Sequence, residues 1–340
     1  MSIGYGGPPP PVPPPYGFNG TQGPPPGLQN YGGMQYGYSN CQGQKKALLI
    51  GINYFGTRYQ LNGCINDART MFTFLTREWG YSPDDIVMLT DDQPNYLSIP
   101  TRENIIRAMQ WLVKDARPND SLVFHYSGHG GQTRNWDGTE SSGYDDTIMP
   151  VDFKITGEIV DDIMHDIMVR RLPPGCRLTA LFDSCHSGTA LDLPFVYSTR
   201  GIVKEPDPIK DSGSSLLQAG KLFLLGDING GSNGINSAFN HLSGNGRSNR
   251  QYQIALKFSP ADVISISGCK DGQTSADSSL GGVAGGAMSK AFIEVMSQYP
   301  NQLYLSLLNN MRIILFNKGY PQKPQMSCSH PLDMNLRFVI

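Results

Sequence analysis

Short apolar runs alternate with longer segments of helical periodicity from Lys45 to the end of the chain. The short runs predict strands, at residues 45–55, 84–91, 120–131, 145–152, 176–188, 259–271, 324–329 and 336–340. Apolar residues at spacings of three and four predict helices, at residues 66–80, 101–116, 159–172, 285–300 and 303–319. Strands that alternate with helices predict an α/β fold with a mostly parallel central sheet covered on both faces.

Two stretches lack this rhythm. Residues 1–44 are rich in Pro, Gly, Gln, Asn and Tyr and contain no charged residue, so we expect a disordered leader. Its PPPPVPPP run favours polyproline II, a candidate ligand for partners with aromatic grooves. Residues 199–250 are rich in Gly, Ser and Asn and predict a mobile connector, although 217–226 has enough apolar residues for local order. Residues 45–198 and 251–340 are then two parts of one globular domain.

Composition excludes several classes of protein. The formal net charge is -2, with no stripe of Lys and Arg, which argues against nucleic acid as a partner. Six cysteines without a CxxC pair predict neither a disulfide scaffold nor a zinc finger. No apolar run is long enough for a membrane span, and no secretory signal is present. We therefore expect a reducing compartment, the cytoplasm, with the nucleus as the alternative.

A histidine and a cysteine follow two of the predicted core strands. In a parallel sheet, ligands bind beyond the carboxyl ends of the strands, and both SGHGG with His129 and DSCHSG with Cys185 occupy such ends. Cys185 is a candidate nucleophile and His129 its proton-exchange partner, and the backbone N–H groups of Gly130 and Cys185 are a candidate oxyanion hole. An inert buried thiol is the alternative for Cys185. His125 falls in mid-strand and is predicted to be structural, and His186 is too close along the chain to Cys185 to act as its base.

The blocks HYSGHGG and DSCHSG place His129 and Cys185 56 residues apart. With GCINDA (63–68), YDDTIMPVD (144–152) and the Pro/Gly/Gln-rich leader, they resemble the type I metacaspases of fungi, within the caspase-like cysteine peptidases. The resemblance covers about residues 45–340. It implies a caspase-like three-layer sandwich, a large-subunit-like part (45–198), a small-subunit-like part (251–340), a monomer, and a role in programmed cell death or in stress and protein quality control. A non-proteolytic scaffold that binds aggregates through the leader and a legumain-type peptidase are the competing interpretations.

An acidic pocket is expected beside the nucleophile. Asp183 precedes Cys185 by two residues and should share its face of the strand, although a capping role for this acid remains open. The resemblance adds a second acid, Asp67, and Cys64 and Ser127 are candidate neighbours in the pocket. Two carboxylates would select protein substrates with Arg or Lys at the cleaved position and reject Asp.

Pairs of acids occur in YDDTIMP and EIVDDIM, and LDLP follows the nucleophile. Solvated surface acids are the ordinary explanation, and carboxylate clusters also suit Ca²⁺. The resemblance implies an activating calcium ion, with ligands at Asp145, Asp161, Asp162 and Asp192. Asp146 is an alternative to Asp145.

The resemblance also implies a zymogen that cleaves itself. The connector offers several basic residues, namely Arg200, Lys204, Lys210, Lys221, Arg247 and Arg250. Removal of the leader is expected near Lys45 or Lys46.

Overall fold

A seven-stranded sheet forms the middle layer of the computed structural model, which describes residues 23–135, 143–184, 190–197, 254–269, 286–320 and 322–340. Its strands are β3 (Lys45–Gly51), β4 (Ile86–Thr90), β5 (Ser121–Ser127), β9 (Arg177–Asp183), β10 (Phe195–Tyr197), β11 (Asp262–Cys269) and β12 (Lys323–Cys328). They lie in the order β10-β12-β11-β9-β5-β3-β4. The strands from β11 to β4 are parallel, and β12 is antiparallel to both of its neighbours. The predicted mostly parallel sheet is confirmed.

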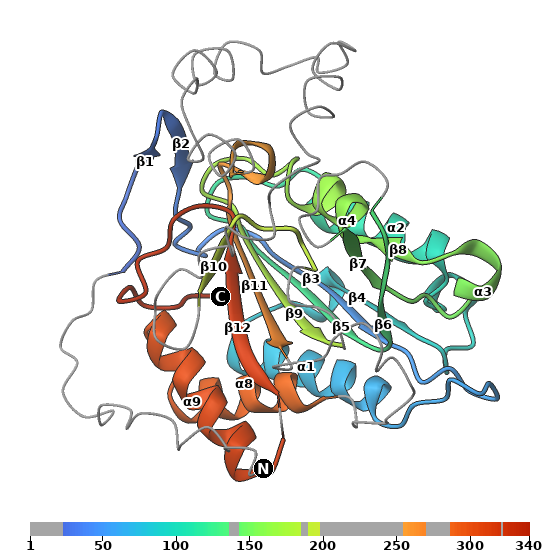
Figure 1. The fold of residues 1–340 in the computed structure, drawn as a ribbon. Coiled ribbons are helices and arrows are strands. Elements are labelled where there is room, and N and C mark those ends of the chain that lie inside the picture. Colours follow the sequence, from blue (N-terminus) through green and yellow to red (C-terminus); the bar gives the residue numbers. More distant parts are fainter. Residues whose placement is uncertain (1–22, 136–142, 185–189, 198–253, 270–285, 321) are drawn as a thin grey trace, which may run out of the picture.

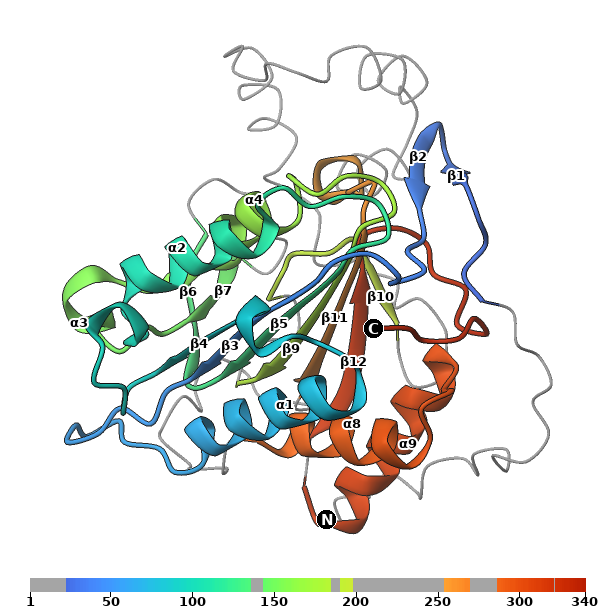
Figure 2. The same cartoon turned by 180° about the vertical axis from the view of Figure 1, so that it is seen from behind.

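Helices cover both faces of this sheet (Figures 1 and 2), which gives the three layers. One face carries α1 (Cys64–Glu78), α8 (Ala287–Gln298) and α9 (Tyr304–Asn317), and the other carries α2 (Arg102–Val113) and α4 (Asp161–Met168). Alternate residues of a strand serve the two layers, because Leu49 of β3 belongs to the first apolar cluster and Leu48 and Ile50 to the second. All five predicted helices are present.

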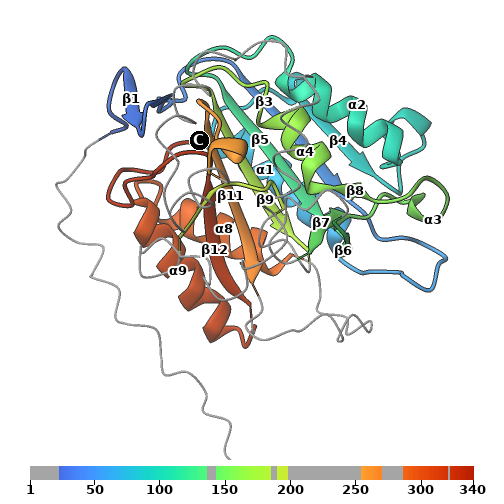
Figure 3. The ribbon, with the colours of Figure 1, turned by 45° about the horizontal axis from the view of Figure 1, so that its top comes forward.

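A second, three-stranded sheet lies at the carboxyl end of β5 (Figure 3). It contains β6 (Gly130–Arg134), β7 (Tyr144–Ile148) and β8 (Ile159–Val160) in antiparallel order. The prediction of one continuous strand over 120–131 is therefore wrong. The chain leaves the main sheet after Ser127, because residues 130–134 pair with β7 instead.

The prediction of disorder over the whole of residues 1–44 is also wrong, because its second half is folded. The hairpin β1 (Leu28–Tyr31) and β2 (Met34–Gly37) leads into an extended segment that reaches β3, and we call residues 28–44 the N-terminal arm. Tyr36 stacks on His330 with ring centroids 4.2 Å apart, and Tyr31 packs edge-on against Phe195. Tyrosines thus supply the apolar contact area that the arm lacks in aliphatic residues. Residues 1–22 lie outside the described part of the chain.

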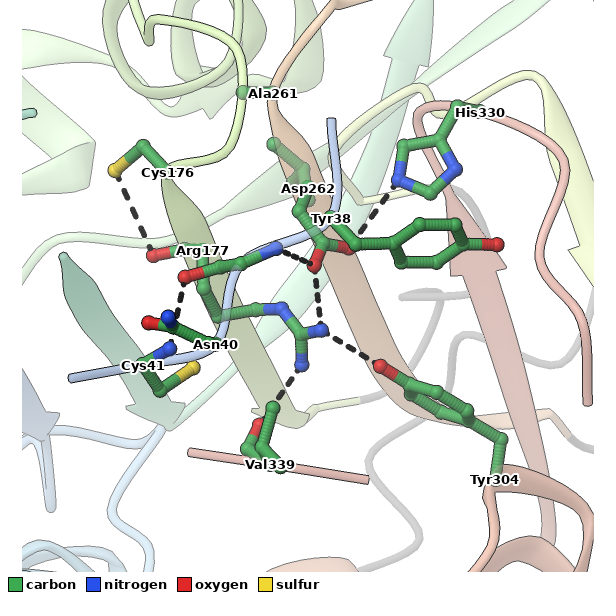
Figure 4. A network of polar contacts seen from close by, with 12 residues as sticks. Tyr38, Asn40, Cys41, Cys176, Arg177, Ala261, Asp262, Tyr304, His330 and Val339 are labelled. Atoms are coloured by element: carbon green, nitrogen blue, oxygen red, sulfur yellow. Dashed lines mark hydrogen bonds and ion pairs between the residues drawn. The ribbon is translucent and has the colours of Figure 1, made fainter. Parts of the chain in front are cut away.

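The N-terminal arm is anchored on a buried charge network at the amino ends of β9 and β11 (Figure 4). Arg177 donates to Asp262 Oδ2 and to the Tyr304 hydroxyl, both at 2.6 Å, and to the Val339 carbonyl at 2.9 Å. The same Asp262 oxygen accepts from the backbone N–H of Ser39, and Asp262 Oδ1 lies 3.2 Å from His330 Nε2. This Arg177–Asp262 network joins the N-terminal arm, the neighbouring strands β9 and β11, and the C-terminal segment at Val339.

The remaining elements are short. They are α3 (Phe153–Thr156) and two 3₁₀ turns, Pro83–Asp85 and Tyr96–Ser98. The strand predicted over 336–340 is wrong: this segment forms only an isolated bridge from Arg337 to Leu303. The predicted connector lies within 198–253, outside the described residues. Among the described helices, none has the length and apolar character needed to cross a membrane.

Candidate active site

The carboxyl ends of β5 and β9 bring the first predicted catalytic block close to Asp183 and Ser184, the first two residues of the second block. The strands are parallel neighbours in the register Ser127 to Asp183, and the Gly128 N–H points at the Asp183 carbonyl at 3.5 Å. His129 follows one strand end directly. Ser184 follows the other, and the candidate nucleophile Cys185, in 185–189, lies outside the described residues. The described chain therefore brings His129 and Ser184 to the same rim of the sheet.

The imidazole of His129 is oriented by a backbone carbonyl. Its Nε2 lies 2.8 Å from the carbonyl oxygen of Tyr59, in the loop between β3 and α1. A carbonyl can only accept, so Nε2 carries the proton, and in the neutral ring Nδ1 keeps the lone pair. His129 thus has the tautomer needed for Nδ1 to take a proton from a thiol.

The predicted oxyanion-hole donor Gly130 begins β6, opposite Ile148 of β7. The neighbouring bond runs from Met149 N–H to the His129 carbonyl, which makes Gly130 and Ile148 a non-hydrogen-bonded pair. The pairing of β6 with β7 therefore does not use the Gly130 N–H. This group, on the residue after His129, is left for another acceptor.

The four predicted pocket residues converge at this rim. Ser127 donates to Asp67 Oδ2 at 2.9 Å, and Asp183 is paired with Ser127 across the strands. Cys64 begins α1, one turn before Asp67. The two carboxylates are 1% and 7% exposed, respectively, so the sheet edge holds two buried acids side by side.

The two acids differ in what they bind. Asp183 Oδ1 and Oδ2 accept from the backbone N–H groups of Met288 and Ser289, each at 2.8 Å, so Asp183 caps the amino end of α8. The sequence left open a capping role for Asp183 at the end of its own strand; the structure shows it as a cap of a distant helix instead. Asp67 Oδ1, by contrast, has no hydrogen-bond partner among the described residues, although the half-exposed Lys290 ammonium lies 3.5 Å away.

Space at Asp67 depends on a glycine. Gly286 precedes α8 with φ of 94°, and a Cβ there would lie 2.2 Å from Asp67 Oδ1. Any other residue would displace the carboxylate or the start of α8. The glycine at position 286 therefore allows the start of α8 to approach the Asp67 carboxylate closely.

Burial shapes the ionisation of this cluster. It raises the pKa of Asp67 to about 6, and the charge of Asp183 adds to the effect. Burial also raises the pKa of Asp183, against the hydrogen bonds from α8. The Cys64 thiol has its pKa raised to about 11, and Cys176 and Cys328 to about 12, again through burial. These three cysteines are protonated at neutral pH, which makes each of them a poor nucleophile.

Three of the four predicted calcium ligands gather in a second place. Carboxylate oxygens of Asp145, Asp161 and Asp162 lie within 4.8 Å of one another, where β7 meets the start of α4. Asp145 and Asp161 are buried. Three carboxylates this close repel each other, and the backbone N–H groups of Asp146 and Asp162, which donate to Asp161 at 3.0 Å each, offset part of this repulsion. Oxygen donors are those that Ca²⁺ prefers. The donor set therefore fits calcium.

The side chains of the other two candidates make different contacts. Asp192 is not a member of this cluster and forms an ion pair with Lys257. Its loop nevertheless lies beside α4, because His165 Nδ1 contacts the Leu191 carbonyl at 2.9 Å. Asp146 accepts from Gln132 at 2.9 Å, so the cluster favours Asp145 over Asp146.

Comparison with known proteins gives one family. The family model for the metacaspase, peptidase C14 domain matches residues 45–194. Metacaspase-1 of Debaryomyces hansenii is 61% identical over 322 residues, which are 94% of this chain and 73% of that protein. Metacaspase-1 of Meyerozyma guilliermondii is 63% identical over 307 residues (90% and 75%), and that of Schizosaccharomyces pombe 56% over 330 residues (95% and 77%). The chain belongs to the metacaspase family.

The metacaspase is therefore a cysteine peptidase of the C14 family with a caspase-like fold, and its substrates are proteins. A crystal structure of protein GSU0716 from Geobacter sulfurreducens has the same fold, with a TM-score of 0.50 at 21% identity over 86% of this chain and 95% of that chain.

Sequence reasoning missed the residues that hold His129. The Tyr59 carbonyl orients its ring, and the hydroxyls of Tyr54 and Tyr126 bond to its backbone. A backbone carbonyl leaves no mark in a sequence, since any residue supplies one. The two tyrosines stood in the apolar runs GINYF and VFHYS, where the pattern indicates core residues and nothing more.

Proposed function

We propose that this metacaspase is a calcium-activated endopeptidase that cleaves after Arg or Lys, with Cys185 as nucleophile and His129 as general acid and base. One observation carries the proposal. The His129 imidazole and the chain entering Cys185 leave adjacent strands at one rim, next to the buried Asp67 carboxylate. Nucleophile, base and a binding group for a cation then surround one peptide bond.

The proposed reaction has two steps. Cys185 Sγ attacks the scissile carbonyl carbon while its proton passes to His129 Nδ1, and the N–H groups of Gly130 and Cys185 stabilise the oxyanion. The imidazole gives the proton to the leaving amine as the C–N bond breaks, which leaves a thioester on Cys185. Water then attacks the thioester, loses a proton to Nδ1, and releases the acid and the free thiol.

The proposed selectivity rests on Asp67. Its Oδ1 atom is buried and accepts no hydrogen bond within the described chain, so an Arg or Lys side chain would supply the missing donor. Asp183 adds negative charge, although its oxygens are already used by α8. An Asp side chain at the cleaved position would meet two carboxylates and be rejected.

Calcium would bind through Asp145, Asp161 and Asp162, with Asp192 as a further donor if its loop turns toward them. A Ca²⁺ ion held there would supply positive charge to the acidic cluster, whose carboxylates come from β7 and α4. Asp192 lies seven residues after Cys185, so order in its loop would extend to the nucleophile.

We further propose that the protein is a monomer of the cytoplasm or nucleus that cleaves itself in the connector. At one edge of the sheet, β10 lies beyond β12 and Phe195 is covered by Tyr31 of the N-terminal arm, which hinders pairing with a second copy. Roles in cell death or in protein quality control stay predictions from the family resemblance.

Hydrolysis of fluorogenic peptides tests the proposal. The wild type should release product from Arg-ended and Lys-ended peptides in millimolar calcium, at least tenfold faster than from Asp-ended peptides. Excess chelator should abolish turnover, and Cys185→Ala and His129→Ala should be inactive under all conditions. Turnover by Cys185→Ala would overturn the mechanism, faster cleavage after Asp would overturn the selectivity, and full activity in chelator would overturn the role of calcium.

A further inference from the structure

Two buried phenol groups lie against the backbone of His129. Tyr54 follows β3, has a φ of 53°, and is 1% exposed. Tyr126 is the last residue but one of β5 and has no exposed surface. Their hydroxyl oxygens are 3.2 Å apart. They come from different elements and meet at the residue that carries the catalytic imidazole.

The phenols bind two peptide groups in a reciprocal pattern. Tyr54 accepts from the His129 N–H at 3.0 Å and donates to the Met149 carbonyl at 2.6 Å. Tyr126 donates to the His129 carbonyl at 2.7 Å and accepts from the Met149 N–H at 3.2 Å. Each hydroxyl thus donates its single hydrogen and accepts one. In this clamp the Tyr54 hydroxyl thus pairs the His129 N–H with the Met149 carbonyl, while the Tyr126 hydroxyl adds a second contact to the Met149 N–H and His129 carbonyl, which also bond to each other at 3.1 Å.

The clamp fixes more than the backbone. The Tyr54 ring lies 4.8 Å from the imidazole between centroids, at an interplanar angle of 46°. With the Tyr59 carbonyl at Nε2, the ring of His129 is held at one nitrogen and on one face, while its two flanking peptide groups are held by the phenols. Rotation of the imidazole or displacement of residue 129 would break at least one of these contacts.

Gly128, the residue before His129, lies against both phenol hydroxyls and must be small. A Cβ at Gly128 would lie 2.7 Å from the Tyr126 hydroxyl oxygen and 3.1 Å from that of Tyr54. The glycine of SGHGG before the histidine therefore makes room for the clamp. Burial raises the pKa of both phenols, so they remain hydrogen-bond donors throughout the neutral range.

We infer that Tyr54 and Tyr126 are positioning residues for the peptidase reaction: their hydroxyls set the place and direction of His129 through its backbone, and His129 alone carries the proton. This inference rests on the proposed function, since it needs His129 as the proton carrier. Small displacements of a catalytic group lower the rate of the chemical step. Substrate binding at Asp67 involves neither phenol, so the clamp should act on kcat and leave KM alone.

Tyr54→Phe, Tyr126→Phe and the double variant test this inference against a matched control. Tyr81→Phe is that control: Tyr81 is a buried tyrosine whose hydroxyl bonds to Ser121 at the amino end of β5, far from the rim. Each clamp variant should lose about tenfold or more in kcat for an Arg-ended peptide, with KM within twofold of the wild type. The double variant should lose less than the product of the two single losses, because the hydroxyls act as one unit. Tyr81→Phe should keep its kcat.

Thermal unfolding separates positioning from loss of stability. All three single variants remove one buried hydroxyl, so their midpoints should fall by similar amounts while kcat falls in only two of them. A wild-type kcat in Tyr54→Phe and Tyr126→Phe, or an equal loss of kcat in Tyr81→Phe, would overturn the inference. If instead the wild type itself fails to hydrolyse, or Cys185→Ala remains active, the proposed function fails and not the clamp.

Discussion

At the scale of single residues, Asp67 is a buried carboxylate whose charge destabilises the folded protein. The carboxylate is buried beside Asp183, and its pKa is raised to about 6. Because this pKa lies above that of an unfolded aspartate, ionisation of Asp67 favours the unfolded chain at neutral pH. A protein that keeps such a group needs the charge for another purpose, which in the proposed function is the recognition of an Arg or Lys side chain of the substrate.

Asp67→Asn should therefore weaken catalysis and strengthen the fold. For an Arg-ended peptide we expect KM to rise at least tenfold at pH 7.5, since the amide bears no charge. In the wild type, KM should also rise as the pH falls below about 6, where Asp67 takes up a proton. That pH dependence should be absent in Asp67→Asn. The pH dependence of KM should also be weak for the wild type acting on a peptide in which neutral citrulline replaces Arg. Steady-state kinetics from pH 5 to pH 8 give KM for the wild type and Asp67→Asn with the Arg-ended peptide and for the wild type with the citrulline peptide.

Denaturant unfolding gives the second readout for Asp67. The shift from 3.8 to about 6 corresponds to up to about 3 kcal/mol. The gain in Asp67→Asn should be complete above pH 6 and vanish as the pH falls toward 4, where the folded wild type is protonated. A variant that is less stable than the wild type at pH 7.5, or one with an unchanged KM, would contradict this account.

How much of the site the sequence could predict depends on the type of contact. The placement of His129 and Asp183 after adjacent strands was predictable from the strand pattern, whereas Asp67 was expected only from the family resemblance. The role of Asp183 as a cap of α8 was not predictable, because its partners are backbone groups 105 and 106 residues away. The same is true of Tyr59, which acts through its carbonyl.

At the scale of elements, the small sheet and α4 form the candidate calcium site. Asp145 belongs to β7, and Asp161 and Asp162 form the first turn of α4, so an ion would hold these two elements together. In Cys185→Ala protein, which cannot cleave itself, calorimetric titration should show calcium binding and a raised unfolding midpoint. Asp162→Asn should weaken binding at least tenfold, because one of three charged donors is lost.

Asp166→Asn is the matched control for the calcium site. Asp166 lies on the same helix, one turn further on, and its side chain is exposed and paired with Arg170. Its replacement should leave calcium affinity unchanged. Equal loss of affinity in both variants would mean that the charge of α4 as a whole matters and not the cluster, and unchanged affinity in Asp162→Asn would place the site elsewhere.

Periodicity was sufficient for the central elements and not for the peripheral ones. β5 and β9 are buried at every position, so their apolar runs are unmistakable. The hairpin of β1 and β2 has no such run, and its order depends on tyrosines that pack on His330 and Phe195 from distant parts of the chain. Contacts of this kind are decided by the folded surface, which composition does not reveal.

At the scale of the whole molecule, the Arg177–Asp262 network ties three parts of the chain together. Arg177 begins β9, Asp262 begins β11, and Ser39 belongs to the N-terminal arm. Burial alone would raise the pKa of Asp262, but Arg177 and His330 hold it at about 2, so the carboxylate is charged at neutral pH. Removal of one partner from such a buried pair costs about 3–5 kcal/mol.

Self-cleavage should therefore leave the N-terminal arm in place. Residues 1–44 contain no Lys or Arg, so a peptidase selective for basic residues cannot cut within them. Lys45 and Lys46 belong to β3, where the Nζ of Lys45 donates to the Trp79 and Ile340 carbonyls and Lys46 is 8% exposed. These contacts argue against the cleavage expected there. After activation with calcium, intact-mass measurements should find an N-terminal fragment that keeps residue 44 and ends in the connector.

The two fragments should also remain one particle in size-exclusion chromatography, because β9 and β11 stay paired and Asp262 still binds both Arg177 and the arm. Asp262→Asn leaves the guanidinium buried without its anion, so after cleavage the fragments should separate or unfold at a lower temperature. Asp333→Asn, at an exposed carboxylate near the same end of the sheet, should behave like the wild type. Fragments that begin at residue 46 or 47 in wild-type digests, and are absent from Cys185→Ala digests, would show that the arm is released after all. The Arg177–Asp262 network would then hold the N-terminal arm in the uncleaved precursor and not in the cleaved enzyme.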